Sequence, residues 1–175
     1  MRRVLQIALL IGLIAAGWWG WRTFFPGPER QVRRQMAALE ELVSFKANEG
    51  NLARLANARQ LASLFTEDVR IRVDVRGGPR GELRGRESIF NAALGARSAL
   101  GSLTVKFLDV VVTISPDKQA ATVEATGRAT QPGIRDFVVQ ELRFRFKRTD
   151  EGWLICEVET VRTLTQRGNE GDLRA

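Results

Sequence analysis

The C-terminal half of the chain is dominated by long segments in which apolar and polar residues alternate. They cover residues 103–114, 120–130, 137–147 and 153–164, with turn residues between them. Alternation sends successive side chains to opposite faces of a strand, so each segment has one apolar face to bury. Short polar turns join such strands in antiparallel order. The pattern therefore predicts a long antiparallel meander with one covered face.

Apolar residues recur at helical spacing in the part of the chain that precedes the meander. Three helices are predicted. The first covers residues 29–47, the second begins at Asn51, which is expected to cap it, and the third covers residues 87–100. Their expected inward residues are Val32, Met36, Leu39 and Val43 in the first, Leu52, Leu55, Ala58, Ala62 and Phe65 in the second, and Ile89, Phe90, Ala93 and Leu94 in the third. Helices followed by strands predict an α+β domain, in which a curved antiparallel sheet wraps round N-terminal helices like a cone.

The first 25 residues predict a membrane anchor. Residues 4–21 are apolar apart from Gln6, which is roughly the minimum length for a helix that crosses a hydrocarbon core of about 30 Å. The flanking residues are Arg2 and Arg3 before this run and Trp18, Trp19 and Trp21 at its end. Indole rings prefer the level of the lipid headgroups, and a charged start favours the cytoplasm. We expect a single-pass protein of a bacterial inner membrane, with its N-terminus in the cytoplasm and its folded domain in the periplasm.

A cleaved signal peptide is the rival interpretation of the same segment. Small residues at 15–17 would supply the cleavage site, but bulky tryptophans follow them directly, so we favour an uncleaved signal anchor. The domain organisation is then a transmembrane anchor at 1–25, a Pro-Gly-Pro linker at 26–28, a folded domain at 29–165 and a polar tail at 166–175. Under either interpretation the folded part lies outside the cytoplasm.

Composition excludes several kinds of chemistry. The chain has no histidine and no tyrosine, which removes imidazole metal ligands and histidine acid–base pairs, and we expect neither a metal nor a cofactor. The one cysteine, Cys156, lies in an apolar strand pattern and is expected to be a buried structural thiol. The formal charge is +7, but without the three arginines that flank the apolar run, 24 basic residues face 20 acidic ones. This small excess argues against nucleic acid as the partner.

Three stretches of the sequence, taken in order, resemble the nuclear-transport-factor-2-like superfamily, which includes the SnoaL-like cyclases and ketosteroid isomerase. LFTEDVRI at 64–71 is similar to the family's helix end and first strand. RGRESI at 84–89 is similar to the start of its third helix, with Gly85 and Ile89 in place, and DEGWLICEVET at 150–160 to its last hairpin. The resemblance covers about residues 29–164. It implies a cone-like fold, a strongly bent sheet round a helix that often has a pocket at the open end, but fold alone does not give function.

In isomerase-like members of that superfamily a carboxylate base lies on the inner side of the first strand. The resemblance places that position at Val73. Asp74 is its neighbour, but alternation sends it to the other face unless a bulge near Val73 turns it inward. The oxyanion donor of that group includes a tyrosine, and other members rely on histidine, and this chain has neither residue type. The known catalytic sets therefore do not transfer.

Asp109 interrupts the apolar segment LDVVV and is the best remaining candidate for catalysis. The functional interpretation is a pocket carboxylate with a raised pKa. The alternative is a bend, because the apolar positions are odd-numbered up to Phe107 and even-numbered from Val110. We favour the bend.

Charged residues form two candidate surfaces. Arg143 and Arg145 face Glu157 and Glu159 across the last hairpin. This predicts an ion ladder on the outer face of the sheet, each pair contributing about 0.2–1 kcal/mol, and a metal-binding or acid–base carboxylate pair is the alternative. The second surface is a Gly/Arg-rich loop with Arg76, Arg80, Arg84 and Arg86. It lacks the Lys-Ser/Thr of a P-loop, so a flexible basic loop is expected rather than a phosphate cradle. Contact of this loop with anionic lipid or nucleic acid is a third interpretation, which predicts binding that collapses with salt.

These observations favour a membrane-anchored, extracytoplasmic binding or scaffold domain without catalysis, serving as an accessory subunit of a membrane complex. Its partner would be a protein or a second copy of the chain that meets the outer face of the sheet. The alternative is a SnoaL-like enzyme or small-molecule carrier, with a small apolar ligand in the cone and Asp109 or Asp74 as acid–base. The small residues at 121–129 fit either a cavity wall or a strand that passes beneath a helix. A polar cavity with a carboxylate would favour the enzyme, and a filled apolar cone the scaffold.

Overall fold

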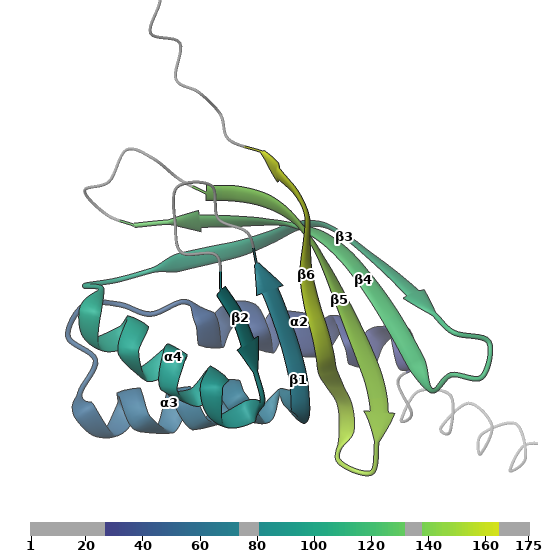
Figure 1. Cartoon of the computed structure of the whole chain (residues 1–175), viewed down its shortest axis with the longest axis horizontal. Helices are drawn as coiled ribbons and strands as arrows, with labels where there is room; N and C mark the ends of the chain where they lie inside the picture. The colour runs from purple at the N-terminus through teal and green to yellow at the C-terminus, as the bar shows by residue number, and fades with distance from the viewer. Residues whose placement is uncertain (1–26, 74–80, 132–137, 165–175) are drawn as a thin grey trace, which may run out of the picture.

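The computed structural model describes residues 27–73, 81–131 and 138–164, which are coloured in Figure 1. In chain order its elements are α2 (Pro28–Val43), α3 (Asn51–Ser63), β1 (Phe65–Val73), β2 (Gly81–Arg84), α4 (Arg86–Ala99), β3 (Thr104–Ile114), β4 (Ala120–Thr130), β5 (Val138–Thr149) and β6 (Gly152–Leu164). The predicted anchor at 1–25 and tail at 166–175 lie outside the described residues. Within these ranges, no helix combines the length and the apolar character that a membrane span requires.

One curved sheet of six strands forms the framework of the domain, in the order β2-β1-β6-β5-β4-β3 (Figure 1). The predicted meander is present, because β3, β4, β5 and β6 are successive antiparallel neighbours. The expectation of a wholly antiparallel sheet is wrong, since β1 pairs with β6 in parallel. The chain passes from β1 through β2 and α4 before it enters the meander, and this long connection allows β1 to lie beside the last strand in the same direction. The fold class is therefore α+β with a mixed sheet.

A short strand, β2, occupies part of the segment that the sequence predicts to be a loop. Gly81–Arg84 pairs antiparallel with the end of β1. Four residues are too few to show a clear alternation, so this strand depends on the backbone donors and acceptors that β1 offers. Gly85 follows at φ 82°, a conformation that favours glycine, and its N–H donates to the carbonyl of Val69 at 2.9 Å. This tight turn starts α4.

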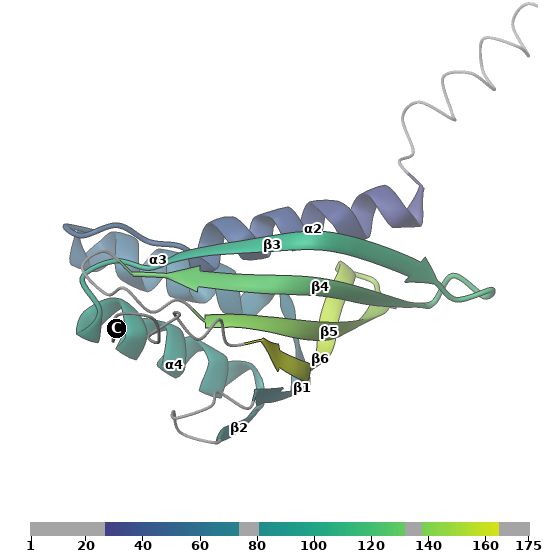
Figure 2. The same cartoon turned by 90° about the horizontal axis from the view of Figure 1, so that it is seen from above.

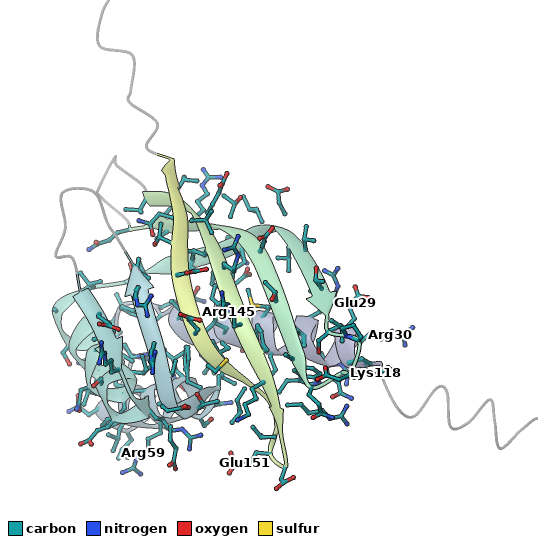
Figure 3. All side chains as sticks on the ribbon, turned by 45° about the vertical axis from the view of Figure 1, so that its right-hand side comes forward. Glu29, Arg30, Arg59, Lys118, Arg145 and Glu151 are labelled. Carbon is teal, nitrogen blue, oxygen red and sulfur yellow. The ribbon has the colours of Figure 1, made fainter. Side chains whose placement is uncertain are left out.

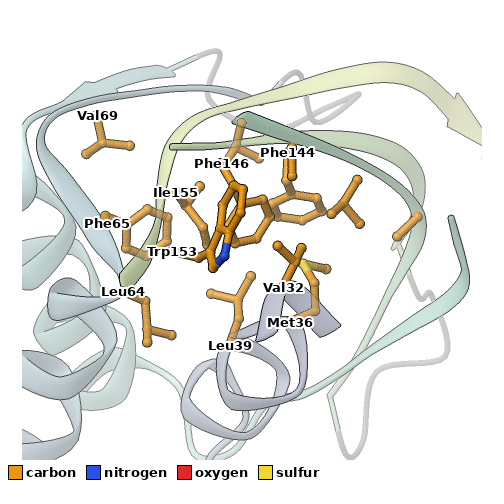
Figure 4. Packing of buried hydrophobic residues seen from close by; sticks show 14 of the residues in the cluster. Val32, Met36, Leu39, Leu64, Phe65, Val69, Phe144, Phe146, Trp153 and Ile155 are labelled. Carbon is orange, nitrogen blue, oxygen red and sulfur yellow. The ribbon is translucent and has the colours of Figure 1, made fainter. Parts of the chain in front are cut away.

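Helix α2 lies against the concave side of the sheet (Figures 1 and 4). Its predicted apolar stripe is buried, with Val32 at 0% exposure and Met36 and Leu39 at 3%. The sheet residues in the same core cluster include Ala121, Val123, Ala125, Phe144, Phe146, Trp153, Ile155 and Val158. Burial of apolar side chains on both sides of this contact is the main source of stability in such a layer. The small residues of β4 thus belong to the packed core beneath a helix, one of the two interpretations of that strand.

The end of α2 comes four residues earlier than the sequence predicts, at Val43. Phe45 instead forms an isolated bridge with Leu103 at the entry to the meander. The Phe45 N–H donates to the Leu103 carbonyl at 2.8 Å, and the Leu103 N–H donates back at 3.0 Å. This backbone pairing with a distant segment stops the helix, and helical periodicity alone could not reveal it.

Helices α3 and α4 pack on each other beside β1 (Figures 1 and 2). The N-cap of α3 is Gly50, without a side-chain hydrogen bond, so the predicted Asn51 cap is wrong. Leu52, predicted to face inward, is 86% exposed, whereas Leu61 is buried. Ala58 and Ala62 are buried as predicted, so the spacing identifies the inner face of α3 but not the exposure of its first turn. In α4, Ile89 is buried as expected.

The predicted bend at Asp109 is confirmed. The register of β3 on β4 shifts between Leu108 and Val111, and Asp109 has φ 53°. Such a bulge adds one residue to a strand and exchanges the side chains that face each side. This exchange explains why the apolar positions change from odd to even numbers in the sequence.

A second bulge, in β6, corrects the prediction for Cys156. The ladder shifts so that Cys156 has no partner residue on β5. The thiol is half-buried rather than buried, and Sγ donates to the Arg145 carbonyl at 3.3 Å. Burial raises the pKa of the Cys156 thiol, which favours the unreactive protonated form.

Candidate functional site

The first strand presents an apolar face to the core and a charged face to solvent. Val69 is 0% exposed and Ile71 packs on the core, whereas Arg72 is exposed. Val73, the position that the resemblance assigns to a base, is the last residue of β1. Asp74 lies outside the described residues. The register shift of β1 against β6 falls in the first half of the strand and not at Val73.

Few polar side chains are buried in the part of the chain that the structure describes. They are Thr66, Arg97 and Gln140, and none of them is a carboxylate. Asp109 is exposed and lines a groove on the outer side of the sheet, so the bend directs this carboxylate away from the core. The described residues also contain no group of three or more acidic or cysteine side chains placed to hold a metal ion.

The outer face of the sheet carries a band of alternating charges, which we call the outer-face network. Its members are Glu82 and Arg84 on β2, Arg72 on β1, Glu157 and Glu159 on β6, Arg143 and Arg145 on β5, and Glu124 on β4. Four arginines and four glutamates give the network a formal charge of zero. Figure 3 looks onto this face, with Arg145 near the middle of the sheet.

Arg143 joins three strands in one part of the network. Its Nη1 lies 3.0 Å from Glu159 on β6, and its Nη2 lies 3.0 Å from Glu124 on β4. Both glutamates are the direct register partners of Arg143. Hydrogen bonds to Glu124 and Glu159 raise the pKa of Arg143. The sequence predicts the pair with Glu159 from the hairpin, but Glu124 becomes a partner only through the order of the strands.

The other part of the network runs from β5 to β2. Arg145 Nη1 lies 3.2 Å from Glu157, which is also 4.0 Å from Arg72 Nη2. Arg72 Nε lies 3.5 Å from Glu82, and Glu82 is 2.8 Å from Arg84. The hydrogen bond from Arg84 lowers the pKa of Glu82. A carboxylate held in this way stays ionised and is a weak base. The alternation of opposite charges makes the network a charge-patterned surface.

A groove of about 420 Å³ opens beside the network on the same face of the sheet. Val111 and Val161 line it and are 58% and 49% exposed. Glu124 and Arg143 of the network line it as well. Exposed apolar side chains with a polar rim are typical of surfaces that bind another protein.

The described arginines of the Gly/Arg-rich loop are engaged within the domain. Arg84 belongs to the outer-face network. Arg86 Nε donates to the Phe65 carbonyl at 3.0 Å, and Nη2 lies 3.9 Å from Glu151 in the β5–β6 turn. The contacts of Arg86 fix the start of α4 on β1, and each of the two side chains already lies near a glutamate of the domain. The remaining members of that predicted surface, Arg76 and Arg80, lie outside the described residues.

A second hollow, of about 650 Å³, lies between α3 and the start of α4. Arg59, Arg84 and Arg86 line it, together with Glu67 and Glu87. The two carboxylates offset much of the positive charge, and a phosphate would meet them as well as the arginines. The hollow therefore does not match a phosphate cradle.

A buried ion pair that the sequence did not predict joins the α2–α3 connection to α4. The Arg97 side chain is 2% exposed, and its Nη1 lies 2.6 Å from Glu49. Asn57 Nδ2 donates to the same carboxylate at 2.7 Å. The Arg97 guanidinium donates to the Leu42 carbonyl and lies 5.0 Å over the ring of Phe45. Burial alone would raise the pKa of Glu49, but the hydrogen bonds from Arg97 and Asn57 outweigh it and the pKa is lowered.

Helix α2 also covers the outer edge of the sheet. β3 is an edge strand, and Figure 2 shows α2 running alongside it. Glu40 accepts from the Phe107 N–H at 2.8 Å and from Lys106 Nζ at 2.6 Å, and Ser44 Oγ accepts from the Val105 N–H at 3.0 Å. Burial would raise the pKa of Glu40, but these hydrogen bonds lower it. Because the Val105 and Phe107 donors are occupied, the first part of this edge is closed to the addition of another strand.

Comparison with known proteins places the fold. A model of the SnoaL-like domain family matches residues 34–159. Similar solved structures include a domain of unknown function with a cystatin-like fold from Nostoc punctiforme, with a TM-score of 0.61 and 18% identity over 81% of this chain and 80% of that one. An NTF2-like protein from Novosphingobium aromaticivorans has a TM-score of 0.58 and 20% identity over 75% and 79% of the two chains. An NTF2-like protein of unknown function from Pseudomonas putida has a TM-score of 0.60 and 10% identity over 84% and 96%. The comparison with curated proteins gives no match.

Proposed function

The chain belongs to the SnoaL-like domain family, and we propose that within this family it serves as a non-catalytic binding or scaffold domain, held at a membrane by its N-terminal segment. The setting in this proposal is the periplasmic side of a bacterial inner membrane, where the domain is an accessory subunit of a membrane complex. The anchoring part of the proposal is supported by the apolar run at 4–21, with its flanking arginines and tryptophans.

The filled concave side of the sheet is the observation that carries the non-catalytic part of the proposal. Packed apolar side chains of α2 and the meander occupy it (Figure 4). No carboxylate is among the buried polar side chains of the described ranges. A general base must lie within hydrogen-bond reach of the bound substrate. Two features of the sequence also support a non-catalytic domain. Val73 stands at the position of the family's base, and the chain has neither histidine nor tyrosine.

The partner surface in this proposal is the outer face of the sheet. The groove with Val111 and Val161 supplies apolar area, and the outer-face network supplies a fixed pattern of charge beside it. Patterned charges favour a partner with the complementary pattern and repel others. The covered edge of β3 supports recognition through the face of the sheet rather than through strand addition. The partner is another protein or a second copy of this chain.

Purification of the tagged full-length protein from its native membrane, in mild detergent, tests the proposal. We expect a stoichiometric protein partner, or the native mass of a homodimer. The double variant Val111→Glu, Val161→Glu should lose that partner, because it places charge in the apolar part of the surface. Leu52→Glu alters a side chain that is 86% exposed on α3, and this control should keep the partner bound.

A lone monomer, or a double variant that keeps its partner, would contradict the proposal. The SnoaL-like enzyme or small-molecule carrier would then become the working hypothesis. Asp109→Asn and Asp74→Asn would be the next variants, tested for loss of turnover or of ligand binding.

A further inference from the structure

Four exposed cations without an ion-pair partner among the described residues gather at one end of the domain, which we call the basic end. They are Arg30 and Arg34 on α2, Lys118 in the β3–β4 turn and Arg148 near the end of β5. Figures 1 and 2 both place the start of α2 and the β3–β4 turn at the same end, and Figure 3 shows Arg30 beside Lys118. The Arg148 N–H donates to the Gln119 carbonyl at 2.8 Å, which brings the end of β5 to that turn.

The acidic residues of the basic end leave its positive charge largely uncompensated. Glu29 lies 3.0 Å from Arg33, so these two charges balance each other. Asp117 accepts hydrogen bonds from the Ser115 hydroxyl and, at 3.0 Å, from the Gln119 N–H. Residues 28–34 and 115–119 together with Arg148 contain five basic and two acidic side chains. The excess of three positive charges creates a field that an anionic surface would feel.

The length of the chain places this end close to the predicted anchor. Helix α2 begins at Pro28, three residues after Phe25, the last aromatic residue of the N-terminal segment. At about 3.6 Å per residue at most, the start of α2 lies within roughly 11 Å of Phe25. The Debye length at physiological ionic strength is about 8 Å. If the N-terminal segment spans a bilayer, the first cations of α2 therefore lie at or near the range in which headgroup charge is felt.

We propose that the basic end rests on the anionic phospholipid headgroups of the membrane that holds the anchor. This inference depends on the anchoring in the proposed function and adds the orientation of the domain to it. Each Lys or Arg near an anionic bilayer favours the bound arrangement by about fivefold. The outer-face network is neutral and internally paired, so it does not compete for the headgroups and is left for a partner.

The test uses the full-length protein in nanodiscs of phosphatidylcholine, with or without phosphatidylglycerol. A fluorophore at position 119, in a Gln119→Cys, Cys156→Ser protein, reports its distance from acceptor dyes on the headgroups. We expect energy transfer to be higher with phosphatidylglycerol at low salt. The difference should vanish at about 0.5 M salt, where the Debye length falls to about 4 Å.

Two charge-matched triple variants separate the basic end from the total charge. Arg30→Gln, Arg34→Gln, Lys118→Gln should lower the ratio of docked to undocked domain on the order of 100-fold. Lys46→Gln, Arg59→Gln, Arg70→Gln removes the same charge from exposed residues elsewhere and should keep the lipid dependence. Thermal melts of both variants control for folding.

The inference would be overturned if energy transfer were equal in the two lipid compositions while the protein still resisted carbonate extraction. That result would leave the proposed anchoring intact. The same loss in both triple variants would also overturn the inference. Extraction of the protein by carbonate would overturn the anchoring and the inference together. RNA or polyglutamate that binds through the basic end, without any effect of phosphatidylglycerol on transfer, would assign the surface to an acidic macromolecule instead.

Discussion

The outer-face network and the basic end differ in whether their charges have partners. Every arginine of the network lies within 4.0 Å of a glutamate, whereas the cations of the basic end have no ion-pair partner among the described residues. Opposite charges in contact cancel each other at longer range, and what remains is a short-range pattern that a close-fitting partner can read. Unpartnered cations keep a field that extends into solvent. In the functions proposed above, the same residue type thus serves recognition in one region and general attraction in the other.

Secondary structure explains the difference. Strand register places Arg143 directly opposite Glu124 and Glu159, so the pairing follows from the backbone ladder. The basic end is built from a helix start, a turn and the end of β5, where the ladder sets Arg148 opposite Trp153 rather than an acidic residue. Charges on a regular sheet can therefore be matched in rows, and charges at the ends of elements remain separate.

The largest expected effect on stability concerns a third case, the ion pair of Glu49 and Arg97, whose charges have partners and are also buried. Glu49→Ala would leave Arg97, whose side chain is 2% exposed, without its carboxylate. We expect the free energy of unfolding to fall by about 3 kcal/mol, because an uncompensated buried charge is costly. Urea unfolding followed by circular dichroism measures it. Glu151→Ala removes a partner of Arg86 at 3.9 Å on a side chain that is 73% exposed, and should change stability by less than about 0.5 kcal/mol.

Equal losses for Glu49→Ala and Glu151→Ala would show that burial does not distinguish these pairs. A further check is Arg97→Met, which removes the buried charge and should cost less than Glu49→Ala does.

Acidification tests the same buried pair without a mutation. Hydrogen bonds from Arg97 and Asn57, against the opposing effect of burial, hold the pKa of Glu49 below its ordinary value of 4.5. The unfolded chain therefore takes up its proton at a higher pH than the folded chain, so this stabilisation is complete above the unfolded pKa and is lost as the pH falls through the folded pKa. Melting temperatures from about pH 6 to pH 3 should decline, and the decline should be smaller in Glu49→Gln. An identical slope in wild type and variant would remove Glu49 as its cause.

A smaller effect is expected in the outer-face network. Arg143→Gln breaks contacts of 3.0 Å to both Glu124 and Glu159, and each exposed pair contributes only about 0.2–1 kcal/mol. We expect a small fall in the midpoint of urea unfolding, well below that of Glu49→Ala. A double-mutant cycle with Glu159→Gln should give a coupling energy that shrinks in about 1 M salt. A coupling energy of zero at low salt would mean that the ion pair of Arg143 and Glu159 does not stabilise the domain.

The smallest effect belongs to the basic end. Arg30→Gln removes a cation that stabilises nothing within the described residues, so the free energy of unfolding should change by less than about 0.5 kcal/mol. The melting temperature measures it. A loss as large as that of Arg143→Gln would show that Arg30 has a structural partner, and the contrast between the two regions would fail.

Much of the fold was readable from the sequence because its causes are local. Alternation within each strand predicted which side chains of β4 and β5 are buried, and the change of phase at Asp109 predicted the bend. The pairs of Arg143 and Arg145 with Glu157 and Glu159 follow from a tight hairpin, whose register is set by its own turn. The spacing of Arg97 after Ile89 and Ala93, on one face of α4, was an available sign that this charge is buried.

The tertiary structure alone decided which distant segments meet. Glu49 and Arg97 are 48 residues apart, and the parallel pairing of β1 with β6 is what brings Arg72 to Glu157. It also decided which arginines lie beside a carboxylate and which, at the basic end, have none among the described residues. A side chain's direction along a strand or helix depends on local backbone geometry, which the sequence encodes directly. The identity of its partner depends on the order of the strands, which is set by the packing of the whole chain around α2.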